Sequence, residues 1–320
     1  MSIKKMITYA GFLAIGVFLL FKLTDLVGDK DALIEKMSSA PAWAISLTFL
    51  MGLLAVISRG LRWNLLLSPM GYKASHTNAV ASVAFGYLAN IFVPRSGEVA
   101  RCATLNSTDD VPVDKLIGTV ITERVVDVAM LLVFLTVALI TNFDAVIGML
   151  SSVQIPGGSA LVMLGLALGV FAIGGYAMLK RRRKSSKVLN FIKGIIYGVK
   201  SIQNMEGRIP FVLHTLFIWI MYYLMAYVLF VSMDGLEELG IFQGLWVMVS
   251  GGFGMLFPSP GGVGSYQGAV MLGFESVGYD KVIGLAVGNV VWITQTTMLI
   301  IAGSIGYFLI IIARLNKSQA

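Results

Sequence analysis

Two apolar stretches of this sequence are each interrupted by a short segment that is rich in proline and glycine. One interruption reads FPSPGGVG at 257–264, and the other reads FVPRSGEV at 92–99. Proline removes a backbone hydrogen bond from a helix, and non-helical backbone at membrane depth is tolerated only inside the protein or beside a water-filled cavity. The two breaks therefore limit the possible folds more strongly than any other feature of the chain.

The composition of the chain is that of a membrane protein. Among 320 residues, 57% are hydrophobic and only 13% are charged, which is far from the mixture found in soluble domains. Most of the net charge of +7 comes from one basic cluster at 180–187. Such a cluster beside an apolar segment marks a cytoplasmic membrane face, so nucleic acid is not an expected partner. A single cysteine and two histidines predict no disulfide, metal site or cofactor.

The apolar segments predict an all-α, polytopic membrane protein that forms a single transmembrane domain over 1–320. Six segments are expected to cross the membrane fully: 6–23, 42–58, 115–140, 159–179, 211–232 and 282–312. The distribution of lysine and arginine places both termini in the cytoplasm and the protein in the inner or plasma membrane. Residues 24–41 are expected to form an outer loop. The stretch 188–205 fits an amphipathic helix on the inner surface or a plain linker.

The segments next to the two breaks are too short to be ordinary spans, because a bilayer core of about 30 Å needs about 20 helical residues. We expect 77–93 and 97–107 to form a re-entrant helical hairpin from the cytoplasmic side. We expect 241–257 and 263–279 to form an opposed hairpin from the outside, with two complete crossings as the alternative. The second piece of that pair carries Gln267, Glu275 and several glycines, which favours the hairpin.

The two halves of the chain match each other in sequence and in predicted direction. Both breaks share the pattern P-x-x-G-x-V, and DKLIG at 114–118 recurs as DKVIG at 280–284. The order of spans and hairpin is the same in each half, with every direction reversed. This pattern predicts an inverted-topology repeat. Its first unit is 1–141, its second unit is 142–187 with 206–320, and 188–205 is a cytoplasmic linker.

Charged residues lie deep inside one predicted span. Glu123, Arg124 and Asp127 belong to the segment 115–140, and each charge inside a membrane costs on the order of 2.5–3.5 kcal/mol. They must therefore be paired or hydrated, and Glu123 and Asp127 share one helix face. Arg59 and Arg62 are also spaced to share a face. Together with Trp63, they are explained equally well as anchors at the cytoplasmic interface.

Arginines, free amides at a helix start and a nearby apolar exit are the features that suit a lipid phosphate headgroup. The candidate headgroup-binding residues are Arg59, Arg62, Asn90, Pro94, Arg95, Gly97, Glu98, Arg101, Glu123, Arg124, Asp127, Pro258, Pro260, Gly261, Gly262, Gly264 and Gln267. A second interpretation is that the charged residues among them form a closed ion-pair network, which only holds the first hairpin in place.

Four motifs in order resemble a known family. They are RGLRW at 59–63, Asn90 followed by PRSGEVAR at 94–101, ERVVD at 123–127 and PSPGGVG at 258–264. They are similar to the flippase-like family built on the transmembrane region of lysylphosphatidylglycerol synthase/flippase. The resemblance implies a multi-pass bacterial or archaeal protein that moves or presents a polar lipid. Family members typically carry a glutamate where this chain has Gln267, and lysyl transfer is not expected here.

We therefore expect a lipid flippase or scramblase without catalytic residues. Its expected partner is a membrane phospholipid or a polyprenyl-phosphate-linked lipid, and a membrane partner protein is possible. Two alternatives stay open. The first is an integral-membrane enzyme that acts on a lipid-linked substrate and uses carboxylates such as Glu98, Glu123 and Asp127. The second is a non-transporting partner subunit of a glycosyltransferase or another cell-envelope machine.

Overall fold

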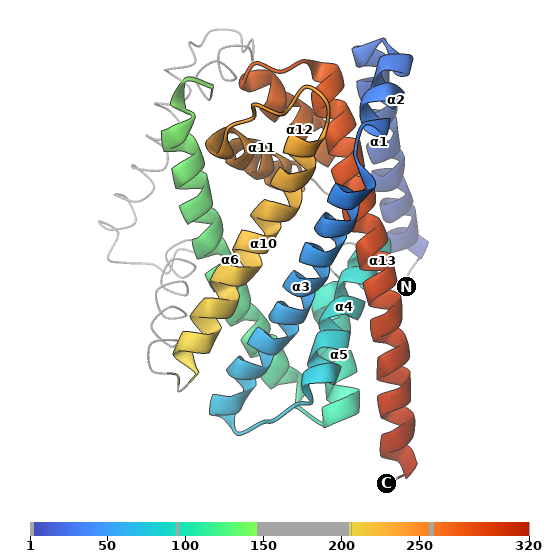
Figure 1. Ribbon diagram of the computed structural model, residues 1–320. Coiled ribbons are helices and arrows are strands. Elements are labelled where there is room, and N and C mark those ends of the chain that lie inside the picture. The colour runs from blue at the N-terminus through green and yellow to red at the C-terminus, as the bar shows by residue number, and fades with distance from the viewer. Residues whose placement is uncertain (1–2, 94–95, 146–204, 206, 256–258, 320) are drawn as a thin grey trace, which may run out of the picture.

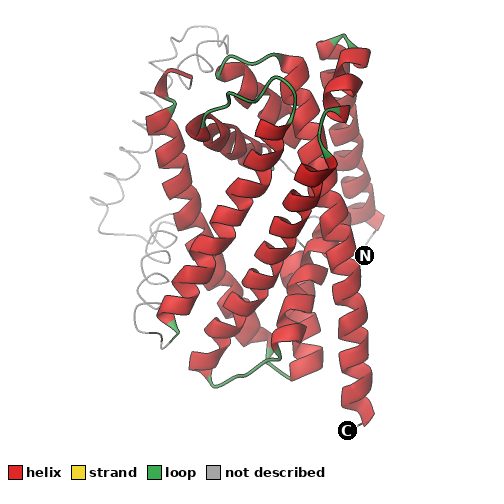
Figure 2. Cartoon of the chain, viewed as in Figure 1, coloured by secondary structure: helices red, strands yellow, loops and turns green. Residues whose placement is uncertain are grey.

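The described part of the chain is helical throughout. The computed structural model describes residues 3–93, 96–145, 205, 207–255 and 259–319, and this part holds helices and short connections without a strand (Figures 1 and 2). The predicted all-α class is confirmed. The expected span 159–179 and all of the expected linker 188–205 except its last residue lie outside the described residues, as do Pro94, Arg95 and Pro258.

Ten helices and two 3₁₀ turns make up the described part. The first half contains α1 (Ile3–Val27), α2 (Lys30–Ser38), α3 (Ala42–Leu67), η1 (Ser68–Met70), α4 (His76–Phe92), α5 (Gly97–Asp109) and α6 (Val113–Thr141). The second half contains α10 (Arg208–Ser232), α11 (Ile241–Gly254), η2 (Pro260–Gly262), α12 (Ser265–Ser276) and α13 (Lys281–Gln319).

Four described helices are long and apolar enough to cross a membrane, namely α3 together with η1, α6, α10 and α13. They correspond to the predicted spans 42–58, 115–140, 211–232 and 282–312. The predicted span 6–23 falls within α1. The total of six spans stays a prediction.

Proline marks the start of three of these long helices. Pro41 and Pro112 immediately precede α3 and α6, and Pro210 lies in the first turn of α10. Proline suits these positions because its fixed φ angle matches a helix and because the first turn leaves its amide positions unbonded.

The two short helix pairs lie at opposite ends of the bundle. In Figure 1, α4 and α5 lie toward the lower end, and α11 and α12 lie toward the upper end. The members of each pair pack against each other, as the helical hairpins require. Re-entry of each hairpin to its own membrane face stays a prediction, as does the inverted repeat.

Glycines let the helices of each hairpin approach closely. At Gly97 of α5, an added Cβ would collide with the Gly86 carbonyl oxygen and would lie 2.5 Å from Asn90 Nδ2. At Gly254 of α11, it would lie 2.5 Å from the carbonyl oxygen of Ser265. Each hairpin therefore depends on a backbone contact that no other residue type permits.

The two largest of the described hydrophobic clusters lie one around each hairpin. One joins α2, α10, α11, α12 and α13, with Phe230, Val270 and Phe274 at its centre. The other joins α3, α4, α5 and α6, with Trp63 and Leu105 fully buried. Helix α3 packs against α4 and α10, and α13 packs against α4 and α12, so these two long helices connect the clusters.

The connection between the first two spans differs from the expected loop at 24–41. Helix α1 continues to Val27, and α2 occupies most of the remainder. The Asp29 side chain caps α2 by accepting a hydrogen bond from the Ala32 amide at 2.9 Å. Leu33 is buried in the core. The loop prediction was wrong because charges alternate here with an apolar face that covers the ends of other helices.

Candidate functional site

Helix α6 contributes two buried carboxylates to the interior. Glu123 is fully buried and the Asp127 side chain is 13% exposed. They lie four residues apart and so face the same side of the helix, as the sequence predicts. A buried carboxylate costs several kcal/mol of desolvation unless cations and hydrogen-bond donors compensate it. The surrounding helices supply that compensation.

Helix α3 supplies two of the cations. The Arg62 guanidinium donates hydrogen bonds to Glu123 Oε1 at 3.3 Å, to Asp127 Oδ1 at 3.0 Å and to the Thr215 hydroxyl at 3.1 Å. It also lies 5.4 Å above the ring of Phe211. Arg59, one turn earlier, donates to Asp127 Oδ2.

Both α3 arginines are therefore buried partners of α6 and are not anchors at the membrane interface. Trp63 is likewise fully buried, and its indole N–H donates to the Thr119 hydroxyl at 2.8 Å. The interface assignment of these three residues was wrong. Helix α3 continues nine residues past the predicted end at 58 because its charges are satisfied inside the bundle.

Helix α5 supplies the third buried cation. Arg101 Nη2 donates to Glu123 Oε2 at 2.6 Å, and the guanidinium lies 4.7 Å above the Trp63 ring. Its Nε lies 3.6 Å from Glu98 Oε2, one turn earlier on the same helix. Glu98 also pairs with Arg124, whose Nη1 lies 3.6 Å from Asp127 Oδ2.

Seven charged side chains from three helices thus form one connected network, which we call the charge cluster: Arg59, Arg62, Glu98, Arg101, Glu123, Arg124 and Asp127. It contains four guanidinium groups and three carboxylates, which leaves one positive charge in excess. All seven residues were predicted as site residues.

A small polar recess borders the charge cluster at the crossing of α4 and α5. Its lining includes Arg59, Tyr87, Asn90, Gly97, Glu98, Arg101 and Arg124. Asn90 Oδ1 accepts a hydrogen bond from the Gly97 amide at 2.7 Å, which fixes the start of α5. The structure therefore brings nine of the predicted residues together at one place.

Residues of the second break lie elsewhere. Gly261, Gly262 and Gly264 have φ angles of 60°, 75° and 76°, which glycine adopts without strain. The Trp292 indole of α13 donates to the Gly261 carbonyl at 2.7 Å. An added Cβ at Gly264 would collide with the Gly16 carbonyl of α1. Together with Pro260, these glycines pack against α1, α4 and α13, and in the described part of the chain no hydrogen bond or ion pair joins them to the charge cluster.

Two tyrosines connect the charge cluster to a central cavity of about 310 Å³. The Tyr222 hydroxyl accepts from Arg59 Nη1 at 3.2 Å and lies 3.1 Å from the Tyr87 hydroxyl. Both tyrosines line the cavity, together with residues of α3, α6 and α10 to α13, among them Trp219, Tyr266 and Gln295. The Trp219 indole nitrogen is buried and has no hydrogen-bond partner among the described residues.

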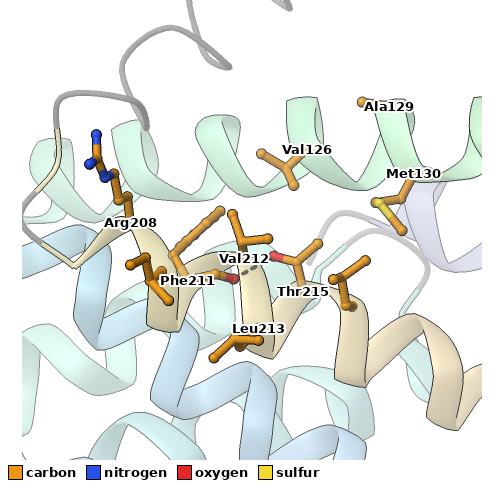
Figure 3. Close-up of a pocket in the computed structure, with 10 residues that line it drawn as sticks. Val126, Ala129, Met130, Arg208, Phe211, Val212, Leu213 and Thr215 are labelled. Carbon is orange, nitrogen blue, oxygen red and sulfur yellow. Dashed lines mark hydrogen bonds between the residues drawn. The ribbon is translucent and has the colours of Figure 1, made fainter.

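A second, apolar cavity of about 470 Å³ lies between α6 and α10. Figure 3 shows Val126 and Met130 of α6 on one side and Phe211, Val212 and Thr215 of α10 on the other. Phe211 and Thr215 also contact the Arg62 guanidinium. The apolar cavity and the Arg62 guanidinium are thus separated by a single layer of side chains.

Sequence reasoning missed Tyr87, Thr215 and Tyr222. The last two lie seven residues apart on α10 and therefore share one face of that helix. That spacing is a usable signal.

A family model described as the lysylphosphatidylglycerol synthase TM region matches residues 9–303. The chain belongs to this family. Part of the chain is also similar to the UPF0104 membrane protein MJ1595 of Methanocaldococcus jannaschii, with 27% identity over 107 residues. That match covers 32% of this chain and 32% of the relative, so it spans about a third of the curated relative's length.

Membership in the lysylphosphatidylglycerol synthase TM family and the four long apolar helices make this chain a multi-pass membrane protein. Gln267, at the position where the resemblance implies a glutamate, is fully buried in α12. Its Oε1 accepts from the Gly264 amide at 2.8 Å, while its Nε2 has no hydrogen-bond partner among the described residues. The glutamine thus caps its own helix, a role that a carboxylate oxygen would also fill.

Proposed function

We propose that this protein moves a phosphate-bearing polar lipid between the two leaflets of the membrane, as a flippase or scramblase. One observation carries the proposal. A buried charge cluster with excess guanidinium groups borders a largely apolar cavity that both hairpins line. A lipid that crosses a bilayer needs such a pair of environments, since its headgroup is charged and its chains are not.

The guanidinium groups favour a phosphate. Arginine presents a planar fork of donors that matches phosphate oxygens, and it stays charged when buried. Four arginines face only three carboxylates in the charge cluster, so the cluster carries one positive charge in excess, which attracts an anionic ligand. The polar recess beside Arg59, Arg101 and Arg124 has a free volume of only about 10 Å³, so a phosphate group enters it only when a side chain there moves aside.

The central cavity favours a ligand that is apolar in most of its volume. Its polar groups are few, and they include the Tyr87 and Tyr222 hydroxyls and the unpartnered Trp219 indole. Ligand sites are commonly of this kind, with mostly apolar walls and a few polar groups that fix orientation. The cavity between α6 and α10 adds apolar surface next to Arg62.

The arrangement of the hairpins supports alternating access to this site. In transporters with inverted repeats, substrate sites lie where the two repeats meet, and the repeats rock against each other. Here Tyr87 of the first hairpin and Tyr266 of the second line the same cavity. The proposal therefore takes the two hairpins as the moving gates.

Leaflet exchange in proteoliposomes tests the proposal. The vesicles would carry nitrobenzoxadiazole-labelled phosphatidylglycerol, an aminoacylated lipid or a polyprenyl phosphate, and dithionite would quench the label in the outer leaflet. We expect protein-dependent exchange of at least one phosphate-bearing lipid. The variants Arg59→Gln and Glu123→Gln should reduce it at least tenfold, which corresponds to about 1.4 kcal/mol.

Lys115→Gln is the matched control, because Lys115 lies on α6 as Glu123 does, yet its half-exposed side chain pairs only with Asp114. It should exchange lipid at the wild-type rate. If well-folded wild-type protein exchanges none of the three lipids, with or without a pH gradient, the transport function is wrong and a partner-subunit role becomes the better explanation.

A further inference from the structure

Glu98 differs from the other two carboxylates of the charge cluster. Its side chain is 34% exposed, whereas Glu123 is fully buried and Asp127 is 13% exposed. Glu123 and Asp127 each accept hydrogen bonds from two different arginines. Glu98 instead pairs with Arg124, itself 48% exposed, and lies 3.6 Å from Arg101 Nε. It is the most weakly enclosed anion of the three.

The Arg101 guanidinium is incompletely satisfied on the side that faces Glu98. Arg101 is 3% exposed, and its Nε has no hydrogen-bond partner among the described residues. Its Nη2 is fully engaged with Glu123 at 2.6 Å. A buried donor without an acceptor destabilises the protein. An anion that approached Nε more closely than Glu98 does would recover this energy.

The start of α5 points to the same kind of ligand. The Ser96 side chain precedes α5 but does not cap it, because its hydroxyl donates to the carbonyls of Ala89 and Val93 at 3.0 and 2.7 Å. Asn90 already accepts from the Gly97 amide, and the other amides of a helix start carry partial positive charge and bind phosphate. Glu98, Arg101 and the first turn of α5 all border the polar recess.

We propose that Glu98 is a displaceable counter-ion, which occupies the place of a phosphate ester in the polar recess until that ligand arrives. The phosphate oxygens then pair with Arg101 and Arg124, and the Glu98 side chain turns away from them. This inference rests on the proposed function and names the group by which the transported lipid is recognised.

The charges are consistent with such an exchange. A phosphodiester carries one negative charge, as the Glu98 carboxylate does. Replacing one by the other leaves the excess of one positive charge in the charge cluster unchanged. The fixed pairs of Glu123 and Asp127 with Arg59, Arg62 and Arg101 are not disturbed. The ligand enters without breaking the pairs that stabilise the bundle.

Removing the counter-ion should strengthen binding, whereas loss of a merely structural pair would weaken or abolish it. The full-length protein in detergent would be titrated with short-chain phosphatidylglycerol, with inorganic phosphate and with short-chain diacylglycerol, by calorimetry. We expect Glu98→Gln to bind phosphatidylglycerol about 1.5- to fivefold more tightly than the wild type, the range for a partly exposed ion pair. Diacylglycerol, which lacks the phosphate, should bind equally to both.

Asp114→Asn is the matched control, since it also removes one carboxylate, but from an exposed position at the start of α6. It should bind all three ligands as the wild type does. If Glu98→Gln does not fold, Glu98→Asp tests the same point, because the shorter side chain withdraws the carboxylate, and tighter binding is again expected.

Tighter binding of phosphatidylglycerol alone would support the proposal with a lipid as the ligand. Tighter binding of inorganic phosphate as well would support it with the phosphate group as the sufficient element. Tighter binding of phosphate alone would keep the counter-ion role but argue against a lipid, and so against the proposed function. Unchanged or weaker binding of both ligands by a folded variant would overturn it.

Discussion

The guanidinium of Arg62 lies fully buried between two carboxylates, and each of the three charges is stable there only while the others remain. A buried ion pair adds little compared with apolar packing, but the loss of one partner leaves an uncompensated charge. Individual residues of the charge cluster should therefore differ sharply from exposed charges in their effect on stability.

Replacing Arg62 by glutamine should destabilise the protein by about 3–5 kcal/mol, because Glu123 and Asp127 both lose a cation. Unfolding in detergent with increasing sodium dodecyl sulfate would measure the change. The double variant Arg62→Gln with Glu123→Gln should be less destabilised than the sum of the two single variants. Additive effects would show that the two side chains do not stabilise each other.

The Tyr222 hydroxyl should matter for lipid exchange more than for stability. Tyr222→Phe removes the contacts with Arg59 and Tyr87, at a cost of about 1 kcal/mol. Tyr223→Phe is matched in chemistry, since its hydroxyl donates to the Ile241 carbonyl at 2.7 Å. We expect both variants to lose similar stability and only Tyr222→Phe to slow leaflet exchange. Equal exchange rates would remove Tyr222 from the site.

At the scale of helices, the first hairpin depends on the contact between Gly86 of α4 and Gly97 of α5. This crossing brings Asn90, Glu98 and Arg101 to the recess. Close backbone contact leaves no room for a side chain, so the two helices would have to separate to accept one.

Gly97→Ala should destabilise the protein by about 1–3 kcal/mol, the usual effect of overpacking, and should weaken binding in the recess. Gly118→Ala makes the same chemical change on α6 where no atom lies within 4 Å. It should leave stability unchanged or raise it by up to about 1 kcal/mol. Thermal unfolding of both variants would measure the two changes in stability. A Gly97→Ala protein as stable as the wild type would contradict the close packing.

Helix by helix, the sequence allowed some features to be predicted and not others. Glu123 and Asp127 could be recognised because charge inside an apolar helix is costly and needs partners. Thr215 and Tyr222, which accept hydrogen bonds from Arg62 and Arg59, could not, since a helix face does not reveal which helix it meets. Helix α2 was missed because its cap, Asp29, looked like one more loop charge. Trp63 looked like an interface residue because its buried acceptor, Thr119, lies on another helix.

At the scale of the molecule, the long helices place the connecting segments at the two ends of the described bundle, and these ends are expected to face opposite sides of the membrane. The turn after α3, with Lys73, lies at one end, and the loop between α10 and α11, with Glu238, lies at the other (Figure 1). The distribution of positive residues predicts that the first end is cytoplasmic.

Labelling of single cysteines in intact cells tests this orientation. The variants Lys73→Cys and Glu238→Cys would be made on a Cys102→Ser background, since Cys102 is buried and is the single native cysteine. A membrane-impermeant maleimide should label only Glu238→Cys from outside, and Lys73→Cys only after the cells are opened. The reverse pattern would invert the predicted topology.

Helix α13 runs without interruption for 39 residues, about 58 Å at the helical rise. Near its start it packs closely on α12, at Gly284 and Gly288. At its far end Arg314 donates to Ser107 of α5 at 2.7 Å, and Lys317 pairs with Asp110 at 2.6 Å. One continuous helix thus contacts both hairpins, which the proposed function takes as the gates. We expect a tilt of α13 at one hairpin to be transmitted along the helix to the other hairpin. The opening of one hairpin would then close the other, so that both do not open together and the membrane does not leak.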